Sequence, residues 1–525
     1  MTQNSPTETL ILWADDEIDL LGLHVKFLTE KGYKVITVTN GQDLLEVLRV
    51  QSVDIILLDE NMPGLSGLET LSQIKRLASQ IPVVMITRNE AEDIMEEAIG
   101  AQISDYLIKP VHPNQILLAI KKNIDKSRLV SRKSISDFRQ EFSGLAGSMS
   151  AAGSFSEWEE IYRKLIFWDL DLHALEEKEM YQILQEQLHL ANQQFSRFIR
   201  QNYVDWFGKT ASQQPLLSHD VFRTLLFPLL GKGRKVVVLL MDNFRYDQWL
   251  TVLPLFSGRF RVEKDALFCS ILPTVTQYAR NALFSGLMPA EIVRSYPEYW
   301  IEESSDEESH NMFEHQLLQK QMERLGLQYK TGYEKITLSK SGRKIAENWA
   351  NYRSNDLTVI VCNFSDQVSH SRTEVEMLRE LTSDEAAYRS LTRSWFEHSP
   401  LMELVRNLAR ENVTLVVTTD HGSVRVERPE KVIGDRLTST NLRFKEGRNL
   451  NYNPKSVFEV RTPEKIGLPR KNLSSSYIFA LANDYFVYPK NYNQFVVHFK
   501  DTFQHGGVSM EEMMVPFVVL SPVQS

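Results

Sequence analysis

Short apolar runs alternate with amphipathic segments along the first quarter of the chain. Each run has the length and the β-branched content of a strand, and segments with apolar residues at helical spacing separate the runs. The five runs are Thr9–Ala14, Lys34–Thr39, Val53–Asp59, Pro82–Thr87 and Asp105–Pro110. This alternation predicts a doubly wound parallel sheet over residues 1–125.

Residues 126–210 have a different pattern, in which apolar residues recur at helical spacing without strand-like runs. Trp158, Ile161, Tyr162 and Leu165 form one stripe, and Leu184, Leu188 and Phe195 form another. Such stripes are usually packing faces. The pattern therefore predicts a central helical bundle.

Strand-like runs return in residues 211–525, and three of them end on acidic residues or histidines. The run Val236–Met241 is followed by Asp242, the run that starts at Leu357 leads to Asp366, and the run that starts at Val413 leads to Asp420. Continuous apolar runs suit strands that are buried on both faces of a parallel sheet. Because ligands bind at the carboxyl ends of such strands, we expect the chemistry of this α/β domain to lie there.

Composition limits the possible classes of protein. The chain has 525 residues, 42% apolar and 24% charged, as expected for a globular protein with several domains. It has no apolar run long enough to span a membrane and no signal-peptide pattern, so a cytoplasmic location is expected. Two cysteines exclude a disulfide framework, and a net charge of −9 argues against broad binding to duplex DNA.

Polar residues gather at the ends of the N-terminal strands. They are Asp15, Asp16, Asp59, Thr87 and Lys109. The blocks WADDEIDLL, LLDENMPGLSGLETL, MITRNEAED and DYLIKPV resemble the receiver domain of two-component response regulators. Any one of these carboxylates could instead be a helix N-cap, but five polar residues in register favour a site.

The resemblance to receiver domains implies a role for each of these residues. Mg²⁺ would be bound by Asp15, Asp16, Asp59 and the carbonyl group of Asn61. Asp59 would be the phosphoacceptor, and Thr87 and Lys109 would contact its phosphate. Tyr106 matches the aromatic switch position of the family.

A second constellation lies in the C-terminal domain. Six acidic and imidazole residues occur at or near strand ends: Asp242, Asp366, His370, Asp420, His421 and His505. A single strand-end Asp or His is more often structural, but six together suit a site for two metal ions. In Cys269–Gly286 a short strand gives way to a turn and then a helix, and Thr274 lies at the start of that helix, where a hydroxyl could attack phosphate. Thr274 or Thr276 could also be a simple N-cap.

The blocks MDNFRYDQW, LPTVTQYARNALFSG, NFSDQVSH, VTTDHGS and QHGGVSMEEMMVPFVVL resemble the PglZ domain of the alkaline phosphatase superfamily. The resemblance implies one metal ion held by Asp242, Asp420, His421 and the Thr274 oxygen. It implies a second held by Asp366, His370 and His505, with two Zn²⁺ ions expected and manganese as the competitor. Thr274 would then be the catalytic nucleophile. Arg280 and Asn281 could contact a phosphate oxygen or make ordinary helix-end contacts.

The domain order resembles the response regulators of the type IX secretion system. This resemblance implies phosphorylation by a sensor histidine kinase, homodimerisation on phosphorylation, and signalling to secretion genes through an extracytoplasmic-function sigma factor. We expect a phosphorylation-controlled phosphodiesterase that cleaves cyclic or short oligonucleotides. The alternative is a non-catalytic scaffold that is stabilised by zinc. Direct sequence-specific DNA binding is not expected, because the chain lacks a helix-turn-helix pattern.

The stretch Leu437–Lys471 is rich in Asn, Arg and Lys. It could flank the mouth of the active site and attract a polyanionic substrate. It could equally be an exposed insertion, and the sequence does not decide between the two.

Overall fold

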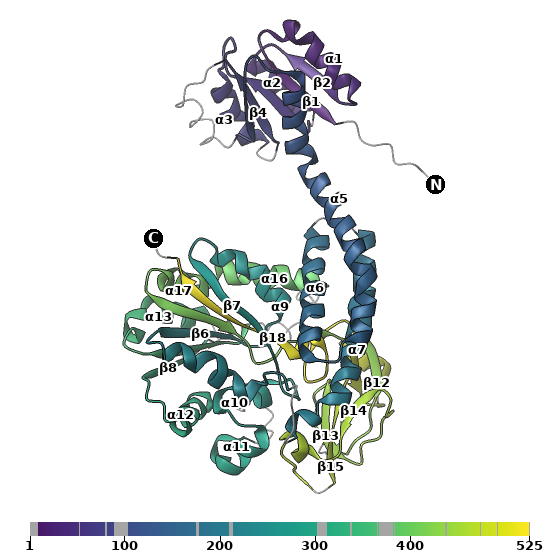
Figure 1. Cartoon of the computed structure of the whole chain (residues 1–525), viewed down its shortest axis with the longest axis vertical. Coiled ribbons are helices and arrows are strands. Elements are labelled where there is room, and N and C mark those ends of the chain that lie inside the picture. Colours follow the sequence, from purple (N-terminus) through teal and green to yellow (C-terminus); the bar gives the residue numbers. More distant parts are fainter. Residues whose placement is uncertain are drawn as a thin grey trace. The chain divides into compact units, whose positions relative to one another are not determined.

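The computed structural model divides into two compact units, Met1–Arg139 and Gln140–Ser525 (Figure 1). It describes residues 9–51, 53–78, 81–88, 103–174, 178–208, 214–301, 312–336, 339–364, 366, 382, 384–435, 438–472, 474–490 and 492–523.

The first unit contains a parallel sheet of five strands in the order β2-β1-β3-β4-β5. The strands are β1 (Leu10–Ala14), β2 (Lys34–Val38), β3 (Ile55–Asp59), β4 (Val83–Thr87) and β5 (Asp105–Ile108). The described helices are η1 (Ile18–Leu21), α1 (Gly22–Glu30), α2 (Gly41–Val50) and α3 (Gly67–Leu77). Every residue of β1, β3 and β4 is buried, as the apolar runs predicted. The doubly wound receiver fold is therefore confirmed.

Local sequence explains where two of these helices begin. The Asn40 side chain accepts a hydrogen bond from the Asp43 backbone N–H and caps α2. Ser66 and Glu69 form a reciprocal capping box at the start of α3. These caps fix the starts of the helices that follow β2 and β3. Because β1 and β3 are parallel neighbours, the strand ends that carry Asp15 and Asp59 lie at the same edge of the sheet.

Three long helices follow: α5 (Pro113–Ala151), α6 (Phe155–Ala174) and α7 (Lys178–Asn202). The predicted stripe of α6 is buried, and Leu184 and Phe195 of α7 are also buried. Trp158 lies edge-on to Phe195, with ring centroids 5.6 Å apart. Both α6 and α7 belong to the second unit, so they share a compact body with the C-terminal domain.

The second unit is built on a six-stranded mixed sheet, in the order β7-β18-β10-β6-β9-β8 among the described residues. The strands are β6 (Lys235–Met241), β7 (Phe260–Cys269), β8 (Thr331–Ile336), β9 (Leu357–Cys362), β10 (Val413–Thr418) and β18 (Met514–Pro522). Strands β8, β9, β6 and β10 are parallel, and β18 runs antiparallel between β10 and β7. Because β6 and β10 are parallel neighbours, the residues that follow them meet at one edge of the sheet.

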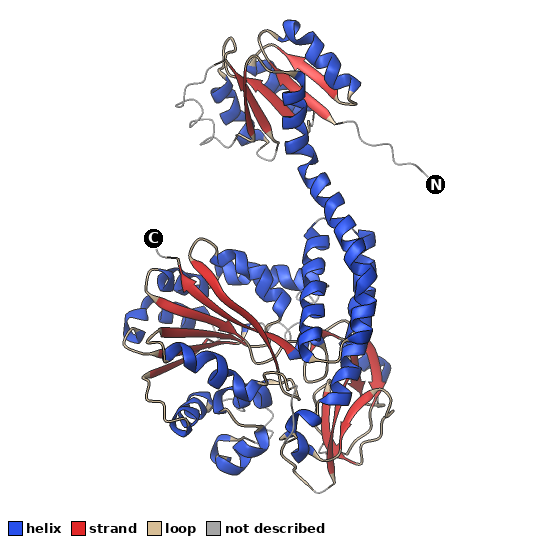
Figure 2. Ribbon diagram, in the orientation of Figure 1, coloured by secondary structure: helices blue, strands red, loops and turns tan. Residues whose placement is uncertain are grey.

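Helices cover both faces of this sheet, with α10 and α12 on one side and α16 and α17 on the other (Figures 1 and 2). The described helices are α8 (Phe227–Leu230), α9 (Tyr246–Val252), α10 (Thr276–Ser285), α11 (Pro289–Ser295), α12 (Glu314–Arg324), α13 (Ser339–Glu347), α16 (Glu385–His398), α17 (Pro400–Ala409), α18 (Tyr492–Phe499) and α19 (Met510–Met513). Alternate residues of β6, including Val236, Val238 and Leu240, pack with Leu283 of α10 and Leu317 of α12 in the main core. None of the described helices is both long enough and apolar enough to cross a membrane.

Small sheets complete the second unit. They are formed by β13 (Phe444–Arg448), β14 (Val457–Val460) and β15 (Ser475–Ala480), by β12 (Arg428–Lys431) and β16 (Asp484–Val487), and by β11 (Val424–Arg425) and β17 (Phe503–Gln504). About half of the Asn- and Arg-rich stretch therefore folds into β13, β14 and their connection, while Leu437 lies outside the described residues.

Candidate functional site

The carboxyl ends of β6 and β10 bring three of the predicted ligands together. Asp242 follows β6, and Asp420 and His421 follow β10 closely. One ligand atom from each residue lies within 4.8 Å of the others, and all three side chains are buried. These residues form the candidate metal centre of the C-terminal domain.

Thr276, the first residue of α10, places its hydroxyl group at this centre. Its Oγ1 lies 3.2 Å from Asp242 Oδ1 and 3.2 Å from His421 Nε2. As the first residue of a ten-residue helix, it also lies beside backbone N–H groups that have no partner within the helix. A hydroxyl, a carboxylate and an imidazole thus converge at a position that favours an anion.

Thr274 has a different environment from the one expected for a nucleophile. Its hydroxyl group donates to the Gly507 carbonyl at 3.1 Å, lies 3.4 Å from Glu512 Oε1, and accepts from the Gly506 N–H at 3.0 Å. These contacts tie the turn before α10 to the segment that carries His505. The structure therefore places Thr276 Oγ1, rather than Thr274 Oγ1, beside Asp242 and His421.

Arg280, one turn further along α10, binds the two carboxylates of the centre. Its Nη2 lies 2.5 Å from Asp242 Oδ2, and its Nε lies 2.9 Å from Asp420 Oδ2. Burial raises the pKa of Asp242 to about 7 despite this guanidinium group, and the nearby carboxylates add to the rise. Burial also opposes ionisation of Asp420, but Arg280 and His421 outweigh it, and the pKa of Asp420 lies below its ordinary value.

Asp366 and His505 lie next to the first cluster. His505 Nε2 lies 3.5 Å from Asp366 Oδ1, and the rings of His421 and His505 are stacked with centroids 4.5 Å apart. Asn243 links the two groups, because its Nδ2 donates to Asp366 and its backbone N–H donates to Asp420, each at 3.4 Å. Five of the six predicted ligands therefore share one neighbourhood. His370 lies outside the described residues.

The donor set fits zinc. His421 Nδ1 faces the Gly422 carbonyl at 3.1 Å, and His505 Nδ1 faces the Thr274 carbonyl at 3.3 Å. A carbonyl can only accept, so both Nδ1 atoms carry the proton and both Nε2 atoms keep a lone pair. Burial lowers the pKa of His421 to about 4, which keeps the ring neutral. Neutral imidazoles oriented by backbone carbonyls, together with carboxylates, are typical zinc ligands.

Helix α7 supports the loop that carries His505. The Asn192 amide donates to both carboxylate oxygens of Glu511, at 3.0 and 2.9 Å, and its oxygen accepts from the Met510 N–H at 2.8 Å. Ser196 donates to the Val508 carbonyl at 3.3 Å. We refer to these contacts of Asn192 and Ser196 as the α7 clamp.

A second charged network joins α6 to the segment after Asp242. Arg389 forms ion pairs with Asp169 of α6 and with Asp247 of α9, and Asp247 is also bound by Arg245. All four side chains are buried. The helical linker is therefore connected to the segment after Asp242, through Arg389, and to the segment that follows His505.

Two residues of the site were not assigned a role there by the sequence. Thr276 was considered only as a cap, although it lies in the same block as Thr274, and the sequence does not fix the helix start to within two residues. Asn243 directly follows Asp242 at the strand end, and this position is the one feature of the sequence that could have indicated a role for Asn243 in the site. The sequence left open whether Arg280 and Asn281 contact a phosphate oxygen or make ordinary helix-end contacts. Arg280 binds carboxylates, and Asn281 is buried on α10.

The receiver unit holds the second candidate site. Asp15, Asp16 and Asp59 form a group that could bind a metal ion, as expected for Mg²⁺. Lys109 Nζ lies 2.9 Å from Asp15 Oδ2 and 3.0 Å from Asp59 Oδ2. Burial raises the pKa of Asp59 to about 6, and the neighbouring carboxylates add to this effect against the opposing charge of Lys109.

The remaining residues predicted for the receiver site are Thr87, Tyr106 and Asn61. Thr87 ends β4 and is fully buried, and its hydroxyl is hydrogen-bonded to that of Tyr106. Asn61 is exposed, two residues after the end of β3. Their roles in phosphate and magnesium binding remain predictions.

Comparison with protein families divides the chain into three parts. Residues 11–121 match the response regulator receiver domain, residues 128–207 match the PorX response regulator linker domain, and residues 221–520 match the BREX system PglZ alkaline phosphatase-like domain.

Curated relatives and solved structures match the receiver part. YbdJ of Bacillus subtilis, an uncharacterized transcriptional regulatory protein, is 34% identical over 117 residues, which are 22% of this chain and 50% of that protein. ZraR of Klebsiella oxytoca is 34% identical over 119 residues, 23% of this chain and 27% of that protein. The chain thus spans half or less of these relatives. A receiver domain from Clostridium thermocellum is 28% identical, with 23% of this chain and 98% of that chain covered and a TM-score of 0.22.

Proposed function

Because the chain belongs to the PglZ alkaline phosphatase-like family and joins that domain to a receiver and a PorX-type linker, we propose that this response regulator is a phosphorylation-controlled, zinc-dependent phosphodiesterase. One observation carries the catalytic part of the proposal. The Thr276 hydroxyl lies 3.2 Å from both a carboxylate oxygen and an imidazole nitrogen at the start of a helix. A structural N-cap would not require a metal-ligand set around it.

One zinc ion would be held by Asp242, Asp420, His421 and Thr276. The other would be held by Asp366 and His505 with the predicted ligand His370. Bound there, zinc would supply positive charge that lowers the pKa of the Thr276 hydroxyl and balances the negative charge on the phosphoryl oxygens. The Thr276 hydroxyl loses its proton as Oγ1 attacks phosphorus, the P–O bond to the leaving group breaks, and the leaving oxygen takes up a proton, which gives the free alcohol and a phosphothreonine. Water then attacks that phosphorus, the Oγ1–P bond breaks, a proton from the water restores the threonine hydroxyl, and the phosphomonoester is released.

The charge at the centre favours a diester substrate. Arg280 is already bound by Asp242 and Asp420, and its Nη1 lies 3.4 Å from Glu314 Oε1. It is therefore not available to balance the second negative charge of a phosphate monoester. The resemblance to the superfamily points in the same direction, since threonine nucleophiles recur in its nucleotide phosphodiesterase branch. We infer that cyclic or short oligonucleotides are the substrate class.

The test uses zinc-loaded full-length protein with bis(4-nitrophenyl) phosphate and with cyclic and short linear oligonucleotides. We expect hydrolysis that is lost in Thr276→Val and largely kept in Thr274→Val, with zinc content unchanged in the former. If the zinc-loaded wild type hydrolyses neither class of diester, the phosphodiesterase proposal fails.

The receiver domain implies a sensor histidine kinase as the phosphodonor. Phosphate on Asp59 would recruit Thr87 and Lys109 and change the receiver surface through Tyr106, which favours a homodimer. The PorX-type linker supports a role in type IX secretion, with an extracytoplasmic-function sigma factor as the candidate downstream partner.

One observation bears on the alternative, a non-catalytic scaffold in which zinc is a structural element. Arg280 compensates the carboxylates of Asp242 and Asp420 inside the protein, so the fold does not need zinc to neutralise them, and a docking function would not depend on bound zinc. A Thr276→Val strain decides between the two functions. Normal secretion signalling and normal partner capture in that strain would favour docking over catalysis.

A further inference from the structure

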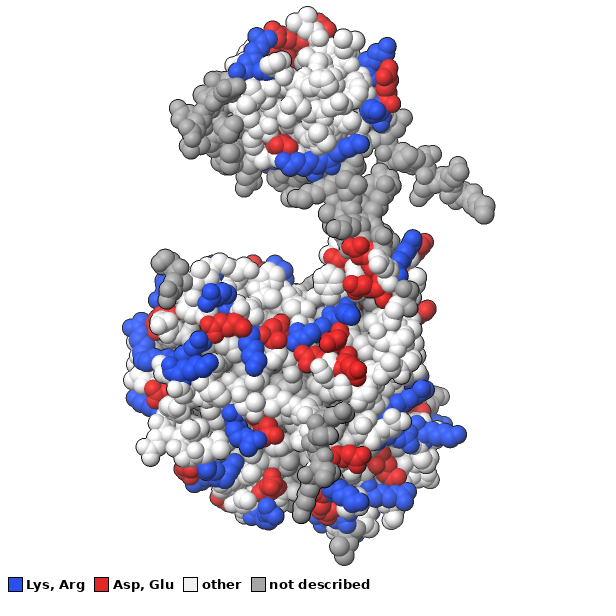
Figure 3. Space-filling view, in the orientation of Figure 1, with Lys and Arg blue, Asp and Glu red and all other residues white. Residues whose placement is uncertain are grey.

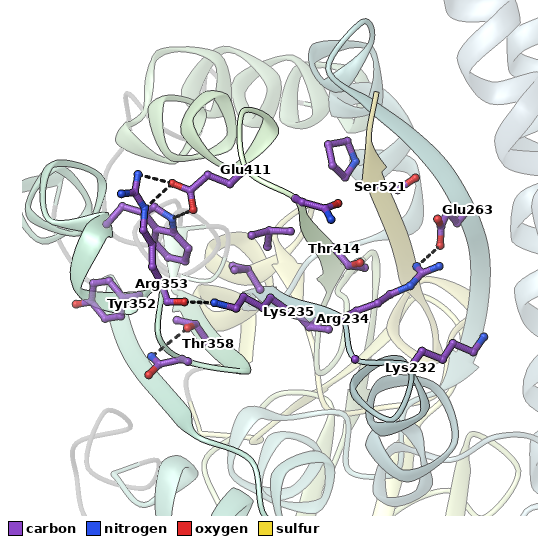
Figure 4. A pocket seen from close by; sticks show the side chains of 18 of the residues that line it. Lys232, Arg234, Lys235, Glu263, Tyr352, Arg353, Thr358, Glu411, Thr414 and Ser521 are labelled. Carbon is purple, nitrogen blue, oxygen red and sulfur yellow. Dashed lines mark hydrogen bonds and ion pairs between the residues drawn. The ribbon is translucent and has the colours of Figure 1, made fainter. Parts of the chain in front are cut away.

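A cavity lies at the end of the six-stranded sheet opposite the candidate metal centre. Its volume is about 1020 Å³, and it is lined by the turn before β6 and by residues at the starts of β9 and β10 (Figure 4). Lys235 begins β6 and lines the cavity, whereas Asp242 follows the last residue of that strand. At about 3.3 Å per residue, the strand separates the two sites by about 20 Å. The cavity is therefore distinct from the proposed catalytic site.

The cavity is positively charged although the whole chain has a net charge of −9. Its lining includes the cations Lys232, Arg234, Lys235, Arg261 and Arg353. Only two acidic residues, Glu263 and Glu411, line it with them. On the face shown in Figure 3, basic and acidic side chains of the second unit are instead interspersed. The lining thus concentrates one sign of charge in a concave space, where its field is strongest.

The two acidic residues orient guanidinium groups at the wall. Arg234 Nη1 lies 2.6 Å from Glu263 Oε2, and Arg353 Nη2 lies 2.8 Å from Glu411 Oε1 (Figure 4). Each arginine has five N–H donors, and one carboxylate oxygen uses few of them. Within the described residues, no carboxylate forms a salt bridge with Lys232, Lys235 or Arg261. The cavity therefore offers both oriented donors and a net positive charge.

The rest of the lining is polar, with one aromatic wall. The hydroxyl-bearing residues Thr358, Thr414 and Ser521 lie around the cavity with Asn355 and Asn412. Tyr352 stacks on Trp349, with ring centroids 5.5 Å apart, and its hydroxyl donates to Glu334 at 2.6 Å. The ring is thus held rigidly beside the cations. Cations with hydroxyl groups and a fixed ring suit a ligand that carries phosphate groups next to a planar base.

We propose that this cavity binds a small organic polyphosphate, such as a nucleoside di- or triphosphate, at a regulatory site separate from the candidate metal centre. The volume lies at the upper end of the range for small-molecule sites. A metal ion alone does not fit, because cations outnumber carboxylates in the lining. An acidic protein segment is the competing occupant, and the experiment distinguishes it.

The test measures binding of adenosine triphosphate, of inorganic tripolyphosphate and of a ten-residue polyglutamate peptide to the full-length protein by calorimetry at constant salt. The variant is Lys235→Gln combined with Arg261→Gln. Both residues are exposed, and the glutamine at 235 can still donate to the Arg353 carbonyl. We expect saturable binding of both phosphate ligands, weakened about tenfold or more in the variant, because two charge-assisted contacts are lost. Arg261→Glu is a second variant and should weaken binding further.

Lys264→Gln provides the matched control, since Lys264 is an exposed cation on the same strand, β7, but does not line the cavity. Equal affinities in the wild type and the double variant would overturn the proposal, as would equal losses in the double variant and the control. Binding of polyglutamate without binding of either phosphate ligand would replace it with an acidic protein partner. None of these outcomes depends on catalysis at Thr276.

Discussion

The side-chain amide of Asn192 donates hydrogen bonds to both carboxylate oxygens of Glu511, at 3.0 and 2.9 Å. Asn192 belongs to the helical linker, and Glu511 belongs to α19, which follows the loop that carries His505. Burial raises the pKa of Glu511 above its ordinary value. The linker thus supplies hydrogen-bond donors to a carboxyl group that is partly buried.

Asn192→Ala should therefore destabilise the second unit. The change leaves the partly buried carboxyl group of Glu511 and the Met510 N–H without their Asn192 partner, which costs about 1–3 kcal/mol. Urea unfolding followed by fluorescence measures the loss. Arg197→Ala, at an exposed position on the same helix, is the control and should change the free energy of unfolding by less than about 0.5 kcal/mol. A smaller loss for Asn192→Ala than for the control would contradict this account.

The two threonines of the turn before α10 should separate catalysis from stability. Thr276→Val removes the hydroxyl at Asp242 and His421, so diester turnover should fall by more than about 10³-fold with little change in stability. Thr274→Val removes a buried hydroxyl that bonds Gly506 and Gly507, so it should cost about 1–3 kcal/mol while turnover is largely kept. Steady-state kinetics and thermal unfolding of both variants provide the comparison. Loss of turnover in Thr274→Val but not in Thr276→Val would identify Thr274 as the nucleophile.

The sequence predicted the strand ends well because apolar runs and their terminal residues are local features. The run Val53–Asp59 became β3, whose last residue is Asp59, and Asp242 follows β6 as expected. The choice between Thr274 and Thr276 depends on where α10 begins, which local preferences do not fix. The apolar stripes of α6 and α7 indicated packing faces but not their partners. The residues that Asn192 contacts lie 318 and 319 positions away in the chain, and no periodicity encodes such a pairing.

His189 should make stability depend on pH. Its pKa is raised, first by the hydrogen bond with Glu427, and its Nε2 lies 3.3 Å from Glu427 Oε2. A folded-state pKa above the unfolded value of about 6.5 means that the contribution is complete below that pH and is lost as the pH rises through the folded-state pKa. Urea unfolding of wild type and His189→Gln at about pH 6 and about pH 9 measures it. We expect the difference between the two proteins to shrink at the higher pH. An increase would show that His189 stabilises the fold in its neutral form.

Asp59 should control the oligomeric state. In the presence of a small-molecule phosphodonor and Mg²⁺, the wild type should dimerise, whereas Asp59→Ala should remain monomeric because it cannot be phosphorylated. Sedimentation velocity gives the dimer fraction. Asp19→Ala, which removes an exposed carboxylate of the same unit, should behave like the wild type. Equal dimer fractions in Asp59→Ala and wild type would mean that another event drives association.

The α7 clamp affects how this protein could evolve by recombination. Asn192 and Ser196 hydrogen-bond to Glu511 and to the Val508 carbonyl, where the phosphatase-like domain meets α7. A gene fusion that exchanged the linker for an unrelated helical segment would leave the carboxyl group of Glu511 without the donors that Asn192 supplies. The linker and the domain it supports are therefore expected to be inherited together, as a single cassette.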